Sequence, residues 1–170
     1  RFRMSVFSET VTDISSARRN PNMGEMVDTL NSLRKTPESL IERCITDYSN
    51  QIQNKSVVII ISDFLTDIEQ IESSLNRLKG SEVILVNTLD ESEIEPEMQG
   101  DKILKDPESD KTIRTYLSKK TRKKYQDRMT EHTQNIEEAA RKYGANYLMV
   151  STGEDFFESF TELWRLINQD

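Results

Sequence analysis

The amino-acid sequence predicts an α/β fold, in which an open and mostly parallel β-sheet lies between two layers of helices and carries an antiparallel strand at one edge. The first observation is the unbroken aliphatic run at residues 57–61, which has no polar face and is typical of a strand buried on both sides. The second is that two further apolar runs, at residues 83–86 and 147–150, are separated by segments with helical periodicity. Strands that alternate with helices form parallel sheets with right-handed crossovers, so we expect these runs to lie parallel in one sheet.

Two short strands and two helices are predicted before the first apolar run. Residues of β type on either side of Ser8 and Glu9 indicate a tight turn, with residues 10–14 as the antiparallel edge strand. Apolar residues at helical spacing predict an amphipathic helix over residues 23–34, with the face Met26, Val27, Leu30 and Leu33. A second helix is expected to start at Thr36, which is followed by a proline and an acid, and to bury Leu40, Ile41, Cys44, Ile45 and Tyr48.

The middle of the chain predicts a helix, a buried strand and a polar insertion. Thr66 and Glu69 match a capping box, and the helix that follows has the stripe Ile68, Ile71, Leu75 and Leu78 before Gly80. Residues 81–89 form the next strand. The polar insertion covers residues 90–115 and contains a predicted β-hairpin around the turn residues 106–110.

A long helix, a strand and a last helix complete the prediction. The long helix covers residues 118–143 and is ended by Gly144, with the face Tyr125, Met129, His132, Ile136, Ala139 and Tyr143. Its basic start, SKKTRKKY, could bind a phosphate or a partner, but a solvated helix turn is the more common interpretation. The last strand covers residues 145–151, and the last helix has the stripe Phe156, Phe160, Leu163, Trp164 and Ile167.

Composition and charge exclude several classes of protein. The 170 residues are enough for one domain, residues 1–170, with a substantial core. A net charge of -7 argues against a nucleic-acid binder. Cys44 is the only cysteine, so an intrachain disulfide and a cysteine-rich zinc site are excluded, and a reducing compartment is expected. The longest apolar run is far shorter than the roughly 20 residues that a membrane helix needs, so we expect a soluble segment without membrane contact.

Asp63 is the first candidate functional residue, because it places a charge at the carboxyl end of an apolar strand, where open α/β sheets bind ligands. An alternative with equal local support is that Asp63 accepts backbone hydrogen bonds in a turn. Thr36 is explained locally as a helix cap. His132 is the only histidine, and its place on an apolar stripe favours a packed or hydrogen-bonded core histidine over a ligand or catalyst. Cys44 is expected to be an inert hydrophobe, and no glycine-rich phosphate loop is present.

Several segments occur in the order and approximate spacing of a known family. They are VVIIISDFLTD, EVILVNTLDESEIEP, KILKDPESDKTI, the helix with Tyr125 and His132, and GANYLMVSTGEDFF. Together they resemble the von Willebrand factor A domain, and more closely the version in the DUF58 family of prokaryotic proteins. The resemblance covers nearly the whole chain and implies a three-layer, Rossmann-like open sheet.

This resemblance implies a metal-ion-dependent adhesion site at the carboxyl edge of the sheet. In von Willebrand A domains a divalent cation is held by an Asp-x-Ser-x-Ser loop after the first strand, a threonine before a helix, and an aspartate that ends the fourth strand. Thr36 matches the threonine and Asp63 matches the aspartate. Hard oxygen ligands of this kind suit Mg²⁺ or Mn²⁺. The partner-binding residues implied by the resemblance are Thr36, Ser62, Asp63 and Phe64.

The Asp-x-Ser-x-Ser element is missing from the sequence. DESEI at residues 90–94 imitates it, but Ile94 occupies the place of the last serine and the segment follows the wrong strand. The resemblance therefore implies that the chain is truncated at its N-terminus and starts after the family's first strand. Either a neighbour supplies that strand, or the sheet closes up between Val6 and Val58. We expect the ion in the full-length protein and none in this segment alone.

The resemblance favours a non-enzymatic protein-interaction module of a larger intracellular, cytoplasmic protein, working with a MoxR-type AAA+ ATPase in complex assembly. The alternative is a metal-dependent hydrolase that uses Asp63, Asp67 and Asp90 at adjacent strand ends, although the sequence offers no pattern for a general base or activated nucleophile. Phosphoester hydrolysis that vanished in Asp63→Ala would favour the hydrolase. A structural fragment without a ligand is the third hypothesis.

Overall fold

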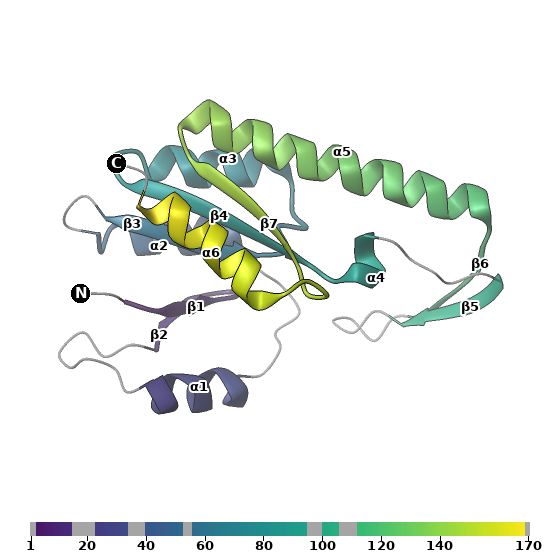
Figure 1. The fold of residues 1–170 in the computed structure, drawn as a ribbon, viewed down its shortest axis with the longest axis horizontal. Coiled ribbons are helices and arrows are strands. Elements are labelled where there is room, and N and C mark those ends of the chain that lie inside the picture. Colours follow the sequence, from purple (N-terminus) through teal and green to yellow (C-terminus); the bar gives the residue numbers. More distant parts are fainter. Residues whose placement is uncertain are drawn as a thin grey trace.

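Three parallel strands form the main sheet. The computed structural model describes residues 3–14, 23–33, 40–52, 56–94, 100–105 and 112–168, of which 100–105 and 112–117 are described by their backbone alone. The strands are β3 (Val57–Ser62), β4 (Glu82–Leu89) and β7 (Asn146–Ser151), in the order β3-β4-β7 (Figure 1). Ile60 lies beside Leu85, which lies beside Tyr147. The predictions of an α/β fold and of parallel pairing among these runs are confirmed.

The hydrophobic core lies between one face of this sheet and three helices, α2 (Ile41–Ser49), α3 (Ile68–Arg77) and α5 (Lys119–Tyr143). Alternate strand residues point to the same face, which brings Val58 and Ile60 of β3 to the helices together with Val83 and Leu85 of β4. From the helices the core takes Ile41, Ile45, Ile71, Leu75, Ile136, Ala139 and Ala140. These are mostly the residues that helical spacing predicted.

β3 is an edge strand with one open face, so the prediction that residues 57–61 are buried on both sides is wrong. Ile60 is only 5% exposed, whereas its neighbour Ile61 is 59% exposed, and Val57 and Ile59 are exposed with it. Within the described residues β3 pairs with β4 alone. The exposed side chains therefore follow from the lack of a described element over this face and beside this edge.

The strands β1 (Ser5–Phe7) and β2 (Val11–Asp13) form a hairpin of their own. The tight turn between them was predicted, but the expectation that residues 10–14 form the edge of the main sheet is wrong, since among the described strands β2 pairs with β1 alone. Among the described residues the sheet does not close up between Val6 and Val58, because β1 and β3 belong to separate sheets. The hairpin instead contacts the start of α2, where Leu40 N–H donates to Ser8 O over 3.0 Å. The Cys44 thiol, buried as predicted, donates to the same carbonyl over 3.2 Å, and burial raises the pKa of this thiol.

A second hairpin consists of β5 (Gly100–Lys105) and β6 (Thr112–Leu117), which pair antiparallel as predicted. The predicted turn, residues 106–110, lies outside the described residues. A short helix that was not predicted, α4 (Glu91–Ile94), follows β4 directly.

Two helices form as predicted but leave much of their apolar faces exposed. α1 (Met23–Ser32) buries Met26 only. α6 (Phe156–Ile167) contacts β7 and buries none of its described residues fully. Its rings Phe156, Phe160 and Trp164 are exposed and stack along the helix, with successive centroids 6.0 and 6.4 Å apart. The prediction that this aromatic stripe is buried is therefore wrong. None of the helices in the described part of the chain is long and apolar enough to cross a membrane.

The ends of α5 are where the sequence placed them. Ser118 is the N-cap, and its hydroxyl accepts the Thr121 N–H over 3.1 Å. Gly144 ends the helix in the left-handed conformation at φ 71°, with its N–H bonded to Arg141 O over 3.2 Å. The exposed lysines of the first turn agree with a solvated helix start.

Replacing Gly144 by alanine is expected to destabilise the fold by about 1 kcal/mol, because a Cβ disfavours the left-handed conformation. An added Cβ at this position would meet nothing within 4 Å, so the loss comes from the backbone rather than from a clash. Gly144→Asn should cost less, since asparagine tolerates this conformation. Urea denaturation of the two variants provides the measurement, and equal stability of wild type and Gly144→Ala would contradict the assignment.

Candidate functional site

The turn after β3, residues 62–66, is built around side chains that bond to the backbone, and we call it the strand-end loop. Ser62 Oγ accepts the Phe64 N–H over 3.1 Å, and Asp63 Oδ1 accepts the Leu65 N–H, also over 3.1 Å. Serine and aspartate commonly fix turns through bonds of this kind. Asp63 and Leu65 are exposed. The loop therefore presents one carboxylate and one apolar side chain at the carboxyl end of the strand.

Phe64 holds the strand-end loop in a strained backbone conformation. Its φ is 50°, the only positive φ of a non-glycine residue in the described chain. A bulky residue in the left-handed region costs about 1–3 kcal/mol. The Phe64 side chain is 2% exposed and belongs to the main core. Packing of this ring against the helices offsets the strain and anchors the Phe64 side chain.

His132 of α5 joins the same loop from the other side. Its Nε2 lies 2.8 Å from the Phe64 carbonyl oxygen, and because a carbonyl only accepts hydrogen bonds, Nε2 carries the proton. The Thr66 N–H donates to the same oxygen over 2.7 Å. His132 is half-buried and hydrogen-bonded, as its apolar stripe predicted. Its partner was not predicted, since the two residues are 68 positions apart.

The start of α3 differs from the prediction, because Thr66 belongs to the turn before the helix. A capping box at Thr66 and Glu69 is wrong: the N-cap is Asp67, which makes no side-chain capping bond, and the helix begins at Ile68. Thr66 belongs to the turn because its N–H is engaged by the Phe64 carbonyl. Asp63 accepts a backbone hydrogen bond in this turn, which agrees with the alternative interpretation of Asp63 as a turn residue.

Asp90 lies at the end of β4 and fixes the start of α4. Its Oδ1 accepts the Ser92 N–H over 2.9 Å and the Ser92 hydroxyl, while Oδ2 accepts the Thr152 hydroxyl over 2.9 Å. These bonds, those from Ser92 first, lower the pKa of Asp90. The Asp90 N–H donates in return to Glu93 Oε2 over 3.0 Å. Both oxygens of this carboxylate are thus used within the chain.

The structure brings only part of the predicted site together. Ser62, Asp63 and Phe64 share the strand-end loop, whereas Thr36 lies outside the described residues. No group of three or more His, Cys, Asp or Glu side chains that could hold a metal ion occurs in the part of the chain that is described. Asp63, Asp67 and Asp90 do not form such a group. A divalent ion at Asp63 would need further oxygen ligands.

One known protein family matches most of the chain, including the strand-end loop. The family described as "Protein of unknown function DUF58" matches residues 7–135, about three quarters of the chain. The chain belongs to the DUF58 family. The strand-end loop and His132 both lie within the matched part. A solved structure, that of the conserved hypothetical protein BatB from Bacteroides thetaiotaomicron, is similar at 12% identity with a TM-score of 0.47, covering 98% of this chain and 79% of that one. No curated protein matches the chain.

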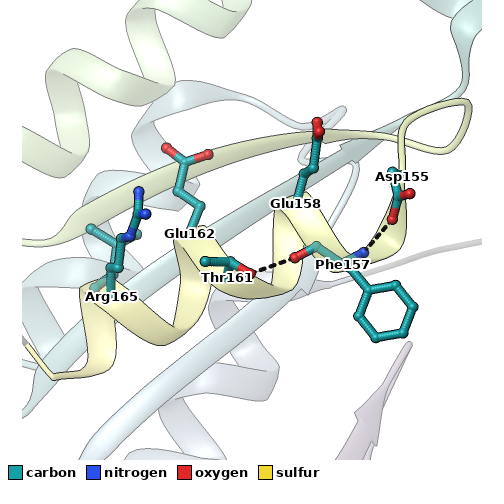
Figure 2. Close-up of a pocket in the computed structure, with 7 residues that line it drawn as sticks. Asp155, Phe157, Glu158, Thr161, Glu162 and Arg165 are labelled. Atoms are coloured by element: carbon teal, nitrogen blue, oxygen red, sulfur yellow. Dashed lines mark hydrogen bonds between the residues drawn. The ribbon is translucent and has the colours of Figure 1, made fainter.

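A groove on this DUF58 chain lies along α6 and not at the strand-end loop (Figure 2). Asp155 caps the helix by accepting the Phe157 N–H over 2.7 Å, and Thr161 bonds to Phe157 O one turn later over 2.7 Å. The residues that line the groove all belong to α6 or to its N-cap: Asp155, Phe157, Glu158, Thr161, Glu162, Arg165 and Leu166. One helix cannot enclose a ligand, and we assign no site here.

Proposed function

We propose that this DUF58 chain is a von Willebrand A-like interaction module of a larger intracellular protein, and that it binds a protein partner through the strand-end loop without catalysing a reaction. The supporting observation is the exposed Asp63 carboxylate on a loop whose backbone is strained and held on both sides. Strain of this kind is concentrated at functional sites, where it fixes geometry before binding. Within the loop Ser62 and Phe64 set the backbone, and Asp63 with Leu65 meets the partner.

The proposal includes Mg²⁺ or Mn²⁺ in the full-length protein. Asp63 would be one ligand, directly or through water, and Thr36 a second, with the remaining oxygens supplied by a segment other than those described. When bound, the ion would attract an acidic residue of the partner. Mg²⁺ sheds its waters reluctantly, so one exposed carboxylate holds it weakly. The chain of residues 1–170 alone is therefore expected to gain no thermal stability from millimolar Mg²⁺.

The partner that we propose is a MoxR-type AAA+ ATPase, in a cytoplasmic assembly. A hydrolase is disfavoured, because catalysis at Asp63 would need a general base or nucleophile beside it. Asp90, the candidate on the neighbouring strand, has both carboxylate oxygens engaged by Ser92 and Thr152.

The decisive experiment measures binding of the full-length protein to a purified MoxR-type ATPase by calorimetry. Asp63→Asn is expected to weaken binding at least about tenfold, because a charge at the centre of an interface loses its partner. Asp67→Asn is the matched control: this carboxylate is exposed, lies just beyond the same loop and makes no capping bond. It should bind like wild type.

Removal of divalent ions by EDTA should reduce wild-type binding to the level of Asp63→Asn. Equal losses in the Asp63 and Asp67 variants would indicate a general charge effect and contradict the proposal. Binding that depended on the ion but not on Asp63 would show that other ligands hold the metal.

A further inference from the structure

We infer that His132 is a positioning residue for the strand-end loop: its Nε2–H holds the Phe64 carbonyl and thereby keeps Asp63 in the geometry that meets a partner. The functional half of this inference rests on the proposed function. Its structural half concerns the loop alone and can be tested without a partner.

The first step of the argument is that α5 gives His132 a fixed place. Ile136, one turn further along the helix, is fully buried, and Ala139 and Ala140 are in the same core cluster. A residue four positions from a buried anchor lies on the same side of a helix. The imidazole is therefore carried by a rigid element and not by a loop that could follow Phe64.

The second step is that the Phe64 peptide groups are bonded on both sides. The N–H of Phe64 donates to Ser62 Oγ, and the N–H of the next residue, Leu65, donates to Asp63 Oδ1. The carbonyl between them points to His132 Nε2 at 2.8 Å. A rotation of Phe64 out of the left-handed region would turn this carbonyl away from His132 and release the Leu65 N–H from Asp63. The orientation of the Asp63 carboxylate is thus coupled to the histidine bond.

The third step is that burial of the Phe64 ring cannot replace the hydrogen bond from His132. Phe64 adopts φ 50° against its own preference, so something other than local sequence must hold it. Burial of its ring fixes the side chain but leaves the carbonyl free to turn. The Thr66 N–H is only two residues away and moves with the loop. Within the described part of the chain, the bond from His132 is the one bond to this carbonyl that comes from a separate element.

The experiment uses His132→Phe, which keeps a ring but has no donor, and His132→Gln, whose amide can donate from a similar place. His132→Leu replaces the first variant if it does not fold. Thr133→Val is the matched control, because the Thr133 hydroxyl donates to Met129 O within α5 itself. NMR measures the intraresidue NOE between the amide proton and Hα of Phe64, which is strong only at positive φ.

A strong NOE is expected in wild type, His132→Gln and Thr133→Val, and a weak one in His132→Phe. A change in global stability alone would not alter this signal in folded protein. Affinity of the full-length protein for the MoxR-type ATPase should fall roughly threefold to tenfold in His132→Phe and recover in His132→Gln, as expected for loss of one hydrogen bond.

An unchanged Phe64 NOE in His132→Phe would overturn the inference. A lost NOE with unchanged affinity would overturn its functional half. If wild type bound no ATPase at all, the proposed function would fail while the NOE still decided whether His132 positions the loop.

Discussion

Replacing Ile60 by aspartate is expected to abolish folding of the chain. Ile60 lies in β3 with its side chain among the core residues of α2, α3 and α5, and it is 5% exposed. An unpaired carboxylate in such a place costs several kcal/mol, against a total stability of about 5–15 kcal/mol for a domain of this kind. Circular dichroism should show loss of the helical signal under conditions in which wild type is folded.

Ile61→Asp is the matched control, because it makes the same substitution one position further along the same strand. Ile61 is 59% exposed on the open face of β3. This variant should fold, with a loss of about 1 kcal/mol or less from reduced strand propensity. Equal unfolding by both substitutions would mean that β3 is buried on both faces, as the sequence predicted, and that its second face is not open.

Most elements of the fold were predictable because each of these is specified locally. An unbroken run such as 83–86 has too few residues for a helix and too little polarity for a loop, so it forms a strand. Gly144 and Ser118 mark the ends of α5 through backbone conformation and capping, which act within one turn. The strands were expected to be parallel because a helix separates each from the next, and a helix is the usual crossover connection between parallel strands.

Burial was predicted less well, because it depends on elements that lie beyond the segment itself. The residues of β3 and the rings of α6 are as apolar as core residues, and their sequence shows that they favour burial. It cannot show whether the described chain covers them. Val57, Phe156 and Trp164 remain exposed for this reason. The same limit explains why the separate pairing of β2 with β1, away from the main sheet, was not predicted.

At the candidate site, Asp63 was predictable and the loop around it was not. A charge directly after an apolar strand is visible in the sequence, and it lies at the strand end as expected. The left-handed Phe64 could not be foreseen, because phenylalanine disfavours that conformation and a local rule would assign it to glycine. The bond to His132 joins distant parts of the chain. A single histidine on an apolar stripe was the available signal, and it indicated a packed or hydrogen-bonded side chain without naming a partner.

Phe64→Ala is expected to destabilise the chain by about 3–5 kcal/mol, because it removes a buried aromatic ring from the core. Phe64→Gly removes the same ring and adds the entropy cost of glycine, which at an ordinary position is about 1 kcal/mol. At φ 50° glycine also relieves the strain of a Cβ, an effect of about 1–2 kcal/mol in the opposite direction. Phe64→Gly should therefore be at least as stable as Phe64→Ala.

Ile71 provides the comparison for this pair, since it is fully buried in the interior of α3, where the backbone is unstrained. There Ile71→Gly should be less stable than Ile71→Ala by about 1 kcal/mol. Urea denaturation of the four variants gives the two alanine-to-glycine differences directly. If glycine were as unfavourable at Phe64 as at Ile71, the left-handed backbone would not be populated in solution. Strain in the strand-end loop could then no longer support a preorganised Asp63, and the case for this loop as the binding surface would lose its principal support.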